Sequence, residues 1–454
     1  MWCHRLSTVL RYTIIRLKGK MADNSNSEYS SATRRLHVIG RALSRNNFSP
    51  TLLVEPSDAL IDEPLSVRVS GLQLHQKITL SAVLRGEGKE FASCAHYTAD
   101  DAGCVDTAVQ PSEGGSFNGI EPEGLLWAMT AQNTSSKRLL IKDVTRPYDV
   151  TISVHSDHMD LKSTQSPCNT SSVLDTTHVR RGYMRDGVQR IPVRKGRLRG
   201  TLFMPLGEGP YPAVLDMFGG TGGLFEFRAA LLASRGFLTF ALAYLLHDGL
   251  PRAFEELDFD YFLEAAEMLY EHPRAQPGGI GVIGSSFGAG LTNMLASFCD
   301  KVTAAVAING VPVSPLRDQD INGQTVIGYI PSVEAAYDEQ SVLYKDYDVL
   351  PIWRYGAKLL HLVSEDDKVV FVSSYRHLMA KVPQDKAHNI QTVFYPGAGH
   401  LLEPPYAPLC RESYVTGGTR VLWGGERKSH AVAQEDSWKR ILDHFNTYLS
   451  KRSV

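Results

Sequence analysis

The chain has 454 residues, and 47 Lys+Arg against 49 Asp+Glu give a formal net charge of −2 at pH 7. This balance argues against a nucleic-acid-binding protein, which needs a basic face to displace counterions. No apolar run reaches the ~20 residues that span a bilayer, and no fixed-period repeat is present. The length therefore predicts a multidomain globular protein without stable membrane insertion.

The cysteines are scattered, without CxxC or Cys/His ligand spacing, which argues against a zinc site. Six cysteines in so long a chain fit a reducing compartment better than a disulfide framework. They are Cys3, Cys94, Cys104, Cys168, Cys299 and Cys410.

The first 22 residues are basic and contain no acidic residue before Asp23. Their apolar residues recur every three or four positions, which indicates an amphipathic basic helix typical of a mitochondrial presequence. We expect residues 1–48 to be a targeting segment or a disordered tail, and the protein to be mitochondrial. A start at Met21 would instead leave a cytoplasmic form.

Between residues 49 and 180, short alternating runs separated by Gly, Pro, Asp and Ser predict an antiparallel β-sandwich domain. Examples of its expected strands are residues 65–69, 78–84 and 150–154. A linker over 156–177 and a hairpin over 189–204 are expected to follow, with the domain boundary within 180–205.

From about residue 211, apolar strand-like runs alternate with amphipathic helical stretches. This pattern predicts βαβ units around a parallel sheet, and an α/β domain over residues 195–450. The expected strands are 213–217, 237–244, 280–283, 302–308, 359–363 and 390–395, and the expected helices are 224–234, 254–270 and 289–298.

A G-x-S-x-G motif, Gly284 to Gly288, lies directly between the strand 280–283 and a helix. In that context the central serine occupies a tight strand-to-helix turn, where small neighbours avoid collisions. The helix N-terminus offers donors to a developing anion. The spacing makes Ser286 the predicted nucleophile, and not Ser285.

A serine nucleophile needs a base and an orienting acid. In this fold class they follow in the order acid, then histidine, each after a later strand. His400 lies in a Gly-rich loop after the strand 390–395, and Asp367 lies in the turn after 359–363. Asp366 remains an alternative acid.

An oxyanion hole needs two backbone N–H groups. We expect one from Phe287, after the nucleophile, and one from Gly219 in the glycine-rich loop after residues 213–217. A phosphate-binding role for that loop is a weaker interpretation, because it has neither the Lys-Ser/Thr of a P-loop nor a GxGxxG order.

Beyond these motifs, the chain from about residue 50 to its end resembles the type I acyl-CoA thioesterases, a group that includes bile acid-CoA:amino acid N-acyltransferase. The resemblance rests on residues 114–117, 124–127, 216–219, 243–244, 305–310, 399–406, 423–426 and 430–434. It implies a β-sandwich fused to an α/β-hydrolase domain, and a Ser–Asp–His triad at Ser286, Asp367 and His400.

The resemblance implies hydrolysis of acyl-CoA to a free fatty acid and CoA, with acyl-CoA as substrate and with no metal or other cofactor. The alternative is conjugation of the acyl group to glycine or taurine, but the conjugating relatives carry Cys as nucleophile. A general carboxylesterase and a non-catalytic binding module are further alternatives. The sequence departs from the family at Phe287, where relatives have Lys, at Gly290, where they have an acidic residue, and over residues 311–343.

Overall fold

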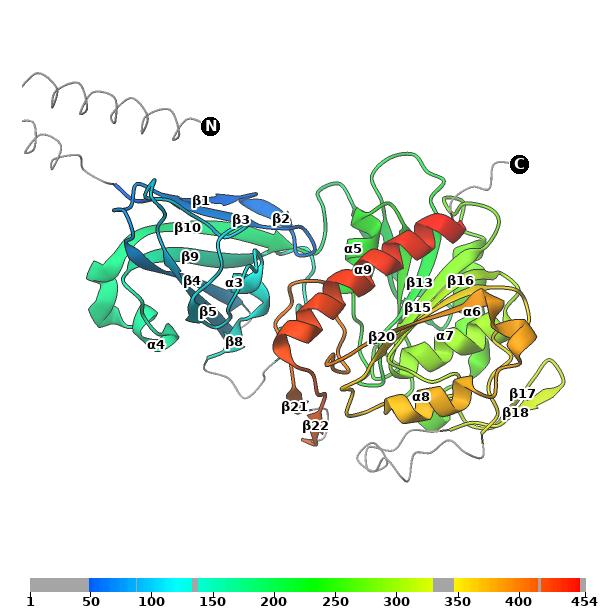
Figure 1. The fold of residues 1–454 in the computed structure, drawn as a ribbon. Helices are drawn as coiled ribbons and strands as arrows, with labels where there is room; N and C mark the ends of the chain where they lie inside the picture. Colours follow the sequence, from blue (N-terminus) through cyan, green and yellow to red (C-terminus); the bar gives the residue numbers. More distant parts are fainter. Residues whose placement is uncertain (1–48, 87, 133–137, 330–346, 415–417, 450–454) are drawn as a thin grey trace, which may run out of the picture.

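The computed structural model describes residues 49–86, 88–132, 138–329, 347–414 and 418–449. It has two lobes connected by one crossing of the chain (Figure 1). The predicted targeting segment, residues 1–48, lies outside the described residues.

The first lobe is built from two sheets that share one apolar core. The smaller sheet contains β1 (Thr51–Glu55), β3 (Ser66–Ser70) and β6 (Val105–Asp106). The larger sheet contains β2 (Asp58–Leu60), β10 (Val173–Gly182), β9 (Tyr148–Ser156), β4 (Lys77–Gly86), β5 (Lys89–Thr98), β7 (Gly114–Gly115) and β8 (Thr130–Ala131). Alternate residues such as Val67 in β3 and Ile152 in β9 are fully buried in the common core, as a β-sandwich requires.

The predicted linker over 156–177 was wrong in part. It holds the short helices α4 (Leu161–Thr164) and η1 (Pro167–Ser172), but its last residues belong to β10, which pairs with β9. Most of this strand is polar and half exposed, so it lacks the alternation that predicts a strand. The same lobe also contains the one-turn helix α3 (Gly124–Trp127).

The second lobe contains an eight-stranded sheet in the order β11-β12-β14-β13-β15-β16-β19-β20. Only the pairs β11–β12 and β12–β14 are antiparallel, and the other neighbours run parallel. The strands are β11 (Gln189–Lys195), β12 (Leu198–Met204), β13 (Ala213–Met217), β14 (Leu238–Ala243), β15 (Ile280–Ser285), β16 (Val302–Ile308), β19 (Lys358–Ser364) and β20 (Ile390–Tyr395). The predicted fold class, an α/β-hydrolase domain after a β-sandwich, is thus confirmed.

Helices cover both faces of this sheet (Figure 1). The helices α5 (Phe227–Ser234) and α9 (Arg427–Leu449) pack on one face, and α6 (Phe259–Tyr270) and α7 (Phe287–Phe298) pack on the other. A Cβ on Gly281 of β15 would lie 2.8 Å from Phe445 of α9, so that the glycine lets the helix approach the sheet closely.

The helix α8 (Val372–Met379) packs against β19 and β20, where the Tyr375 hydroxyl contacts His361 and Thr392. The remaining described elements of this lobe are η2 (Phe254–Glu256), β17 (Gln319–Ile321), β18 (Gln324–Val326), η4 (Gln384–Asn389), β21 (Glu412–Tyr414) and β22 (Arg420–Leu422). The helix predicted over 254–270 is divided into η2 and α6, because the Asp258 side chain accepts the N–H of Tyr261 and so begins a new helix.

The chain passes from the first lobe to the second between β10 and β11, over residues 183–188. β11 pairs with β12 in the second sheet, although it precedes the predicted start of that domain at residue 195. The domain limits 49–180 and 195–450 remain predictions.

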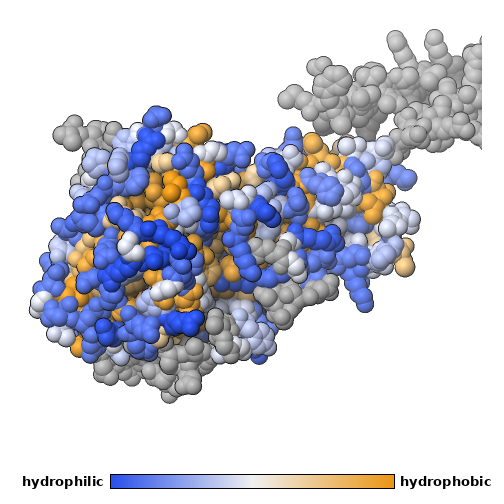
Figure 2. All heavy atoms as spheres, turned by 180° about the vertical axis from the view of Figure 1, so that it is seen from behind, coloured by the Kyte–Doolittle hydropathy of each residue, from blue (hydrophilic) through white to orange (hydrophobic). Residues whose placement is uncertain are grey.

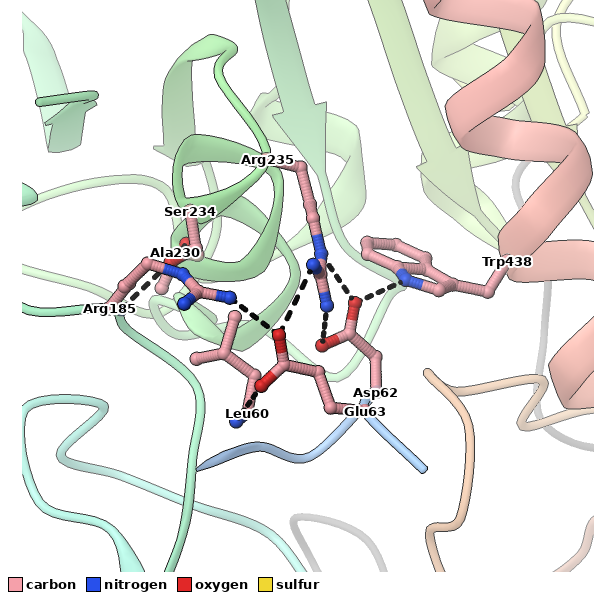
Figure 3. Close-up of polar contacts among 8 residues, drawn as sticks. All are labelled: Leu60, Asp62, Glu63, Arg185, Ala230, Ser234, Arg235 and Trp438. Atoms are coloured by element: carbon pink, nitrogen blue, oxygen red, sulfur yellow. Dashed lines mark hydrogen bonds and ion pairs between the residues drawn. The ribbon is translucent and has the colours of Figure 1, made fainter. Parts of the chain in front are cut away.

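A polar cluster joins the lobes near this crossing (Figure 3). Asp62, in the loop after β2, accepts a hydrogen bond from the indole of Trp438 in α9 at 2.8 Å and pairs with Arg235 at the end of α5. Glu63 pairs with Arg185 at 2.5 Å and with Arg235 at 3.4 Å. The ion pairs to Arg235 therefore connect the sandwich to the end of α5, and the indole hydrogen bond connects it to α9.

The face shown in Figure 2 mixes hydrophilic side chains with small apolar patches. Among the described residues, no helix has the length and apolar character needed to cross a membrane.

Candidate active site

Ser286 lies on the sharp turn between β15 and α7. Its backbone is in an unfavourable conformation for a residue with a side chain, with φ 57° and ψ −120°. The N–H of Ser286 donates to the carbonyl of Ile308 at 2.8 Å, which fixes the turn against the end of β16. Ser286 is half-buried at the carboxyl edge of the sheet, so it remains partly accessible to solvent. The predicted nucleophile needs this accessibility.

Both glycines of the motif are required by close backbone crossings. A Cβ on Gly284 would lie 2.0 Å from the carbonyl oxygen of Gly288, and a Cβ on Gly288 would lie 2.1 Å from that of Phe218. These are the collisions that small residues were predicted to avoid. The first turn of α7 can therefore cross directly over the end of β13.

His400 and Asp367 are in direct contact. The Nδ1 of His400 lies 2.7 Å from Oδ2 of Asp367, and both residues are only 4% exposed. The other carboxylate oxygen, Oδ1, accepts the N–H groups of Val369 and Val370 at 2.7 and 2.9 Å. Because an ionised carboxylate only accepts, Nδ1 carries the proton, and Nε2 is left with a lone pair.

Asp366, the alternative acid, has different partners. Its side chain pairs with Lys368 at 2.5 Å and accepts the N–H of Gly425 at 2.8 Å. Burial opposes ionisation, but Lys368 and the Gly425 N–H outweigh it and lower the pKa of Asp366. The carboxylate bonded to His400 is thus that of Asp367.

The loops that carry Ser286 and His400 meet at Asn309, after β16. The Nδ2 of Asn309 donates to the carbonyl of His400 at 2.8 Å, and its Oδ1 accepts the N–H of Ser364 at 2.7 Å. A Cβ on the next residue, Gly310, would lie 2.8 Å from the carbonyl oxygen of Ser286. Within the described residues no hydrogen bond joins Ser286 Oγ to the imidazole, a contact that commonly closes when substrate binds.

Two backbone segments lie next to Ser286, as the predicted oxyanion hole would require. Phe287 is the first residue of α7, so the helix itself leaves its N–H without an acceptor. The backbone of Gly219 passes close to Ser286, with 3.5 Å between a built Cβ and that of the serine. The hydroxyl of Tyr244 donates to the carbonyl of Gly219 at 2.9 Å and so holds this loop in place.

Two further residues hold the histidine loop. The ring of Trp423 stacks on that of His400, and its carbonyl accepts the His400 N–H at 2.8 Å. His430 of α9 accepts the N–H of Gly399 and contacts the carbonyl of Leu401, each at 3.1 Å. Both residues lie in segments on which the family resemblance rests, 423–426 and 430–434. No motif spacing, however, predicts that they support the His400 loop.

A buried ion pair between Arg228 and Asp216 lies next to the turn that carries Ser286. The guanidinium of Arg228 pairs with Asp216 of β13, donates to the carbonyl of Met217 at 3.0 Å and donates to Ser285 Oγ at 2.7 Å. Burial raises the pKa of Asp216, and the charge of Arg228 opposes that shift. The strand ends that carry Gly219 and Ser286 are therefore held together by one arginine.

The departures from the family are occupied by apolar contacts. The ring of Phe287 stacks on Phe254 with centroids 4.7 Å apart. A Cβ on Gly290 would lie 2.9 Å from the ring of Pro315, so the glycine makes room for that residue. Of the divergent segment 311–343, the structure describes residues up to 329, including the hairpin of β17 and β18.

The described cysteines form no disulfide. Burial, and then the charge of Glu403, raise the pKa of Cys410 to about 12. That thiol stays protonated near neutral pH and provides no competing nucleophile. Within the described ranges, no three His, Cys, Asp or Glu side chains gather as a metal site would require.

A serine on a backbone-constrained strand-to-helix turn, in a domain where a later loop carries an imidazole bonded to a buried carboxylate, is typical of α/β-fold serine hydrolases. Two family models match the chain: "Acyl-CoA thioester hydrolase/BAAT N-terminal region" over residues 62–195, and "BAAT / Acyl-CoA thioester hydrolase C terminal" over 257–451. The chain belongs to this acyl-CoA thioester hydrolase/BAAT family.

The curated relatives include members with different activities in their names. The chain is 40% identical to rat acyl-coenzyme A thioesterase 2, mitochondrial, over 89% of this chain and 90% of the relative. It is 37% identical to mouse peroxisomal succinyl-coenzyme A thioesterase, over 88% and 97%. It is 36% identical to mouse acyl-coenzyme A amino acid N-acyltransferase 1, again over 88% and 97%.

Among solved structures, the chain is similar to a puromycin-hydrolysing peptidase of Mycobacterium tuberculosis. The sequence identity is 17%, the TM-score is 0.39, and the match covers 89% of this chain and 69% of that one. A likeness at this level carries no information about substrate.

Proposed function

We propose that this protein hydrolyses fatty acyl-CoA thioesters to the free fatty acid and CoA through a serine acyl-enzyme. The observation that carries the proposal is the 2.7 Å contact between His400 and Asp367, at the sheet edge where Ser286 occupies its constrained turn. The family membership and the thioesterase names of several relatives supply the substrate class.

In the first step, Nε2 of His400 takes the proton of Ser286 Oγ while Oγ attacks the thioester carbonyl carbon. The backbone N–H groups of Phe287 and Gly219 receive the negative oxygen that forms, and each such donor contributes about 3–4 kcal/mol in comparable sites. The C–S bond then breaks, and the sulfur leaves as the CoA thiol with the proton from Nε2.

In the second step, water gives a proton to Nε2 of His400 and attacks the ester carbonyl. The C–O bond to Ser286 breaks, Oγ recovers the proton, and the free acid leaves. Asp367 accepts the Nδ1–H throughout and stabilises the imidazolium that forms in each step. Asn309 and Trp423 hold the backbone of His400 in place while its ring exchanges protons.

The test is a series of saturated acyl-CoA substrates of increasing chain length, with release of the CoA thiol followed by a thiol reagent. The Ser286→Ala variant should lose thiol release and should no longer be labelled by a fluorophosphonate. The Ser285→Ala variant is the matched control, because it must keep the labelling if Ser286 is the nucleophile. Thiol release by Ser286→Ala at the wild-type rate would refute the proposal.

Transfer of the acyl group to an amino acid is the second candidate, since two of the relatives are named as amino acid N-acyltransferases. An oxygen ester at Ser286 reacts less readily with amines than a thioester does, which favours water as the acceptor. Incubation of acyl-CoA with and without glycine or taurine separates the two. A predominant amide product would replace hydrolysis as the function.

A plain carboxylesterase is separated from a thioesterase by the leaving group. We expect kcat/KM for an acyl-CoA to exceed that for a simple ester of the same acyl chain, because the protein must also recognise the CoA part. Equal values for the two substrates would favour the esterase.

We further propose delivery to mitochondria, with the cytoplasm as the alternative site. The basic, acid-free character of residues 1–22 supports the proposal, as does the similarity to a relative named mitochondrial. Fluorescent fusions that begin at Met1 and at Met21 test it. Mitochondrial signal from both, or from neither, would contradict a targeting role for the first 20 residues.

A further inference from the structure

Arg138 of the sandwich lobe reaches across the domain boundary to the second lobe. Its backbone is anchored in the first lobe, where its carbonyl accepts a hydrogen bond from Lys89 Nζ at 2.9 Å and the following Leu139 packs into the core. Its side chain is 10% exposed, so its charge is almost entirely removed from water.

The partner of this arginine belongs to the loop that carries His400. The Nε and Nη2 groups of Arg138 donate to the same oxygen of Glu403, at 3.1 and 2.6 Å. Two successive backbone contacts, Leu402 N–H to His400 carbonyl and Glu403 N–H to Leu401 carbonyl, both 3.0 Å, make this loop compact. The position of the Glu403 side chain therefore restrains the position of the His400 backbone.

The same guanidinium also contacts the loop on the other side of the site. Its central carbon lies 5.3 Å from the ring centroid of Phe218, within the range of a cation–π interaction. Phe218 directly precedes Gly219 and stacks on Phe225 at 4.1 Å. Phe218, Glu403 and Ser285 line one small cavity of about 20 Å³, so the three segments converge there.

We propose that Arg138 is a positioning residue of the catalytic site, which holds the His400 loop and the oxyanion loop in register from the sandwich lobe. This inference rests on the proposed roles of Ser286, His400 and Gly219. It assigns the sandwich a part in catalysis, because neither loop can move without losing a contact to the same guanidinium.

A second ion pair between the lobes lacks this property. Lys428 of α9 pairs with Glu121 at 2.6 Å, but its side chain is 58% exposed, and neither residue contacts the loops around Ser286. The Glu121 side chain is 17% exposed, but water screens the exposed ammonium of Lys428, so the pair contributes little to stability. Lys428→Gln therefore breaks an ion pair between the lobes without touching the site, and is the matched control for Arg138.

The experiment compares Arg138→Gln, Arg138→Lys, Glu403→Gln and Lys428→Gln. For each, kcat and KM for an acyl-CoA, the rate of fluorophosphonate labelling of Ser286, and the melting temperature are measured. We expect Arg138→Gln to lose about 10- to 100-fold in kcat, the effect of misplacing reacting groups by about 1 Å, with KM nearly unchanged. The labelling rate should fall in parallel, because it needs the same base and oxyanion donors.

The conservative and double variants distinguish positioning from simple stabilisation. Arg138→Lys keeps the charge but not the planar fork, so it should recover part of kcat. Arg138→Gln with Glu403→Gln should lose less than the product of the single losses, because the two residues act as one contact. Only folded variants are compared, and the melting temperature shows whether each variant is folded at the assay temperature.

The inference is overturned if the folded variants Arg138→Lys and Glu403→Gln keep the kcat of Lys428→Gln, or if activity falls only in proportion to unfolded protein. A parallel assay of Ser286→Ala separates this from failure of the proposed function. If Ser286→Ala is inactive while the Arg138 variants are fully active, only the positioning role is refuted. If Ser286→Ala is active, the catalytic assignment itself fails.

Discussion

The imidazole of His400 lies parallel to the indole of Trp423, with ring centroids 5.5 Å apart and planes inclined by 13°. In the proposed mechanism the imidazole becomes a cation in each step, and an aromatic face attracts a cation at this distance by about 0.5–2 kcal/mol. The indole is held in turn by a 2.8 Å hydrogen bond from its N–H to Ser413 Oγ.

We therefore expect Trp423→Leu to lower kcat by about 2- to 30-fold, the rate equivalent of that attraction. Steady-state kinetics on an acyl-CoA measure the effect. Ser413→Ala leaves the ring in place and should have the smaller effect of the two. A Trp423→Leu enzyme with wild-type kcat would show that the stacking is structural only.

The pair of adjacent aspartates offers a direct test of the acid. Asp367→Asn leaves His400 Nδ1 facing an amide and permits the wrong tautomer, so we expect kcat to fall by about 10³- to 10⁴-fold. Asp366→Asn removes a carboxylate charge that faces Lys368 and the Gly425 N–H and does not contact His400. It should therefore lower kcat much less. The reverse ranking of the two kcat values would identify Asp366 as the acid.

The second motif glycine is expected to tolerate no side chain. In Gly288→Ala the new Cβ would meet the carbonyl oxygens of Phe218 and Met217 at 2.1 and 2.6 Å, so α7 or the oxyanion loop must move. We expect a loss of 1–3 kcal/mol in the free energy of unfolding, typical of overpacking, together with loss of most activity. Denaturant unfolding and kinetics measure the two effects.

Gly182→Ala is the control for that substitution. A Cβ there meets nothing closer than Pro147 at 3.7 Å, an ordinary contact. Equal effects of the two substitutions would contradict the close crossing at Gly288.

The catalytic domain could be predicted from sequence because parallel strands covered on both faces are continuous apolar runs. The predicted runs 280–283 and 302–308 correspond to β15 and β16. The long helix α9 was not predicted, because its buried side includes His430, Gln434 and Ser437, which mask an apolar stripe. Tertiary contacts, and not local pattern, determine that helix.

In the site, too, some residues could be predicted from the sequence and others could not. Chain order and the elements on either side indicated Ser286, Asp367 and His400 as the reacting groups. Asn309 and Arg138 could not be found in that way, since their partners are backbone atoms or side chains distant in sequence. A periodicity or a motif spacing records nothing of such contacts.

His430 makes folding stability depend on pH. Burial lowers the pKa of this histidine to about 4, from 6.5 in an exposed chain, although its contact to the Leu401 carbonyl opposes the shift. The folded protein needs the neutral ring, because Nδ1 accepts the Gly399 N–H, and Nε2–H donates to Leu401. Between pH 6.5 and 4 the unfolded chain thus binds a proton that the folded protein does not.

The contribution of His430 to the free energy of unfolding should therefore fall by up to roughly 3 kcal/mol as the pH is lowered from about 6.5 to about 4, and should be constant outside that window. His430→Gln offers an acceptor and a donor without titrating, so its unfolding free energy should fall less over the window. Urea unfolding at several pH values measures the free energy of unfolding of the wild type and of His430→Gln. The difference between the two proteins at pH 8, where His430 is neutral in both the folded and the unfolded state, reports the change in packing alone. Parallel curves from pH 8 to pH 4 would show that His430 is not held neutral in the folded protein.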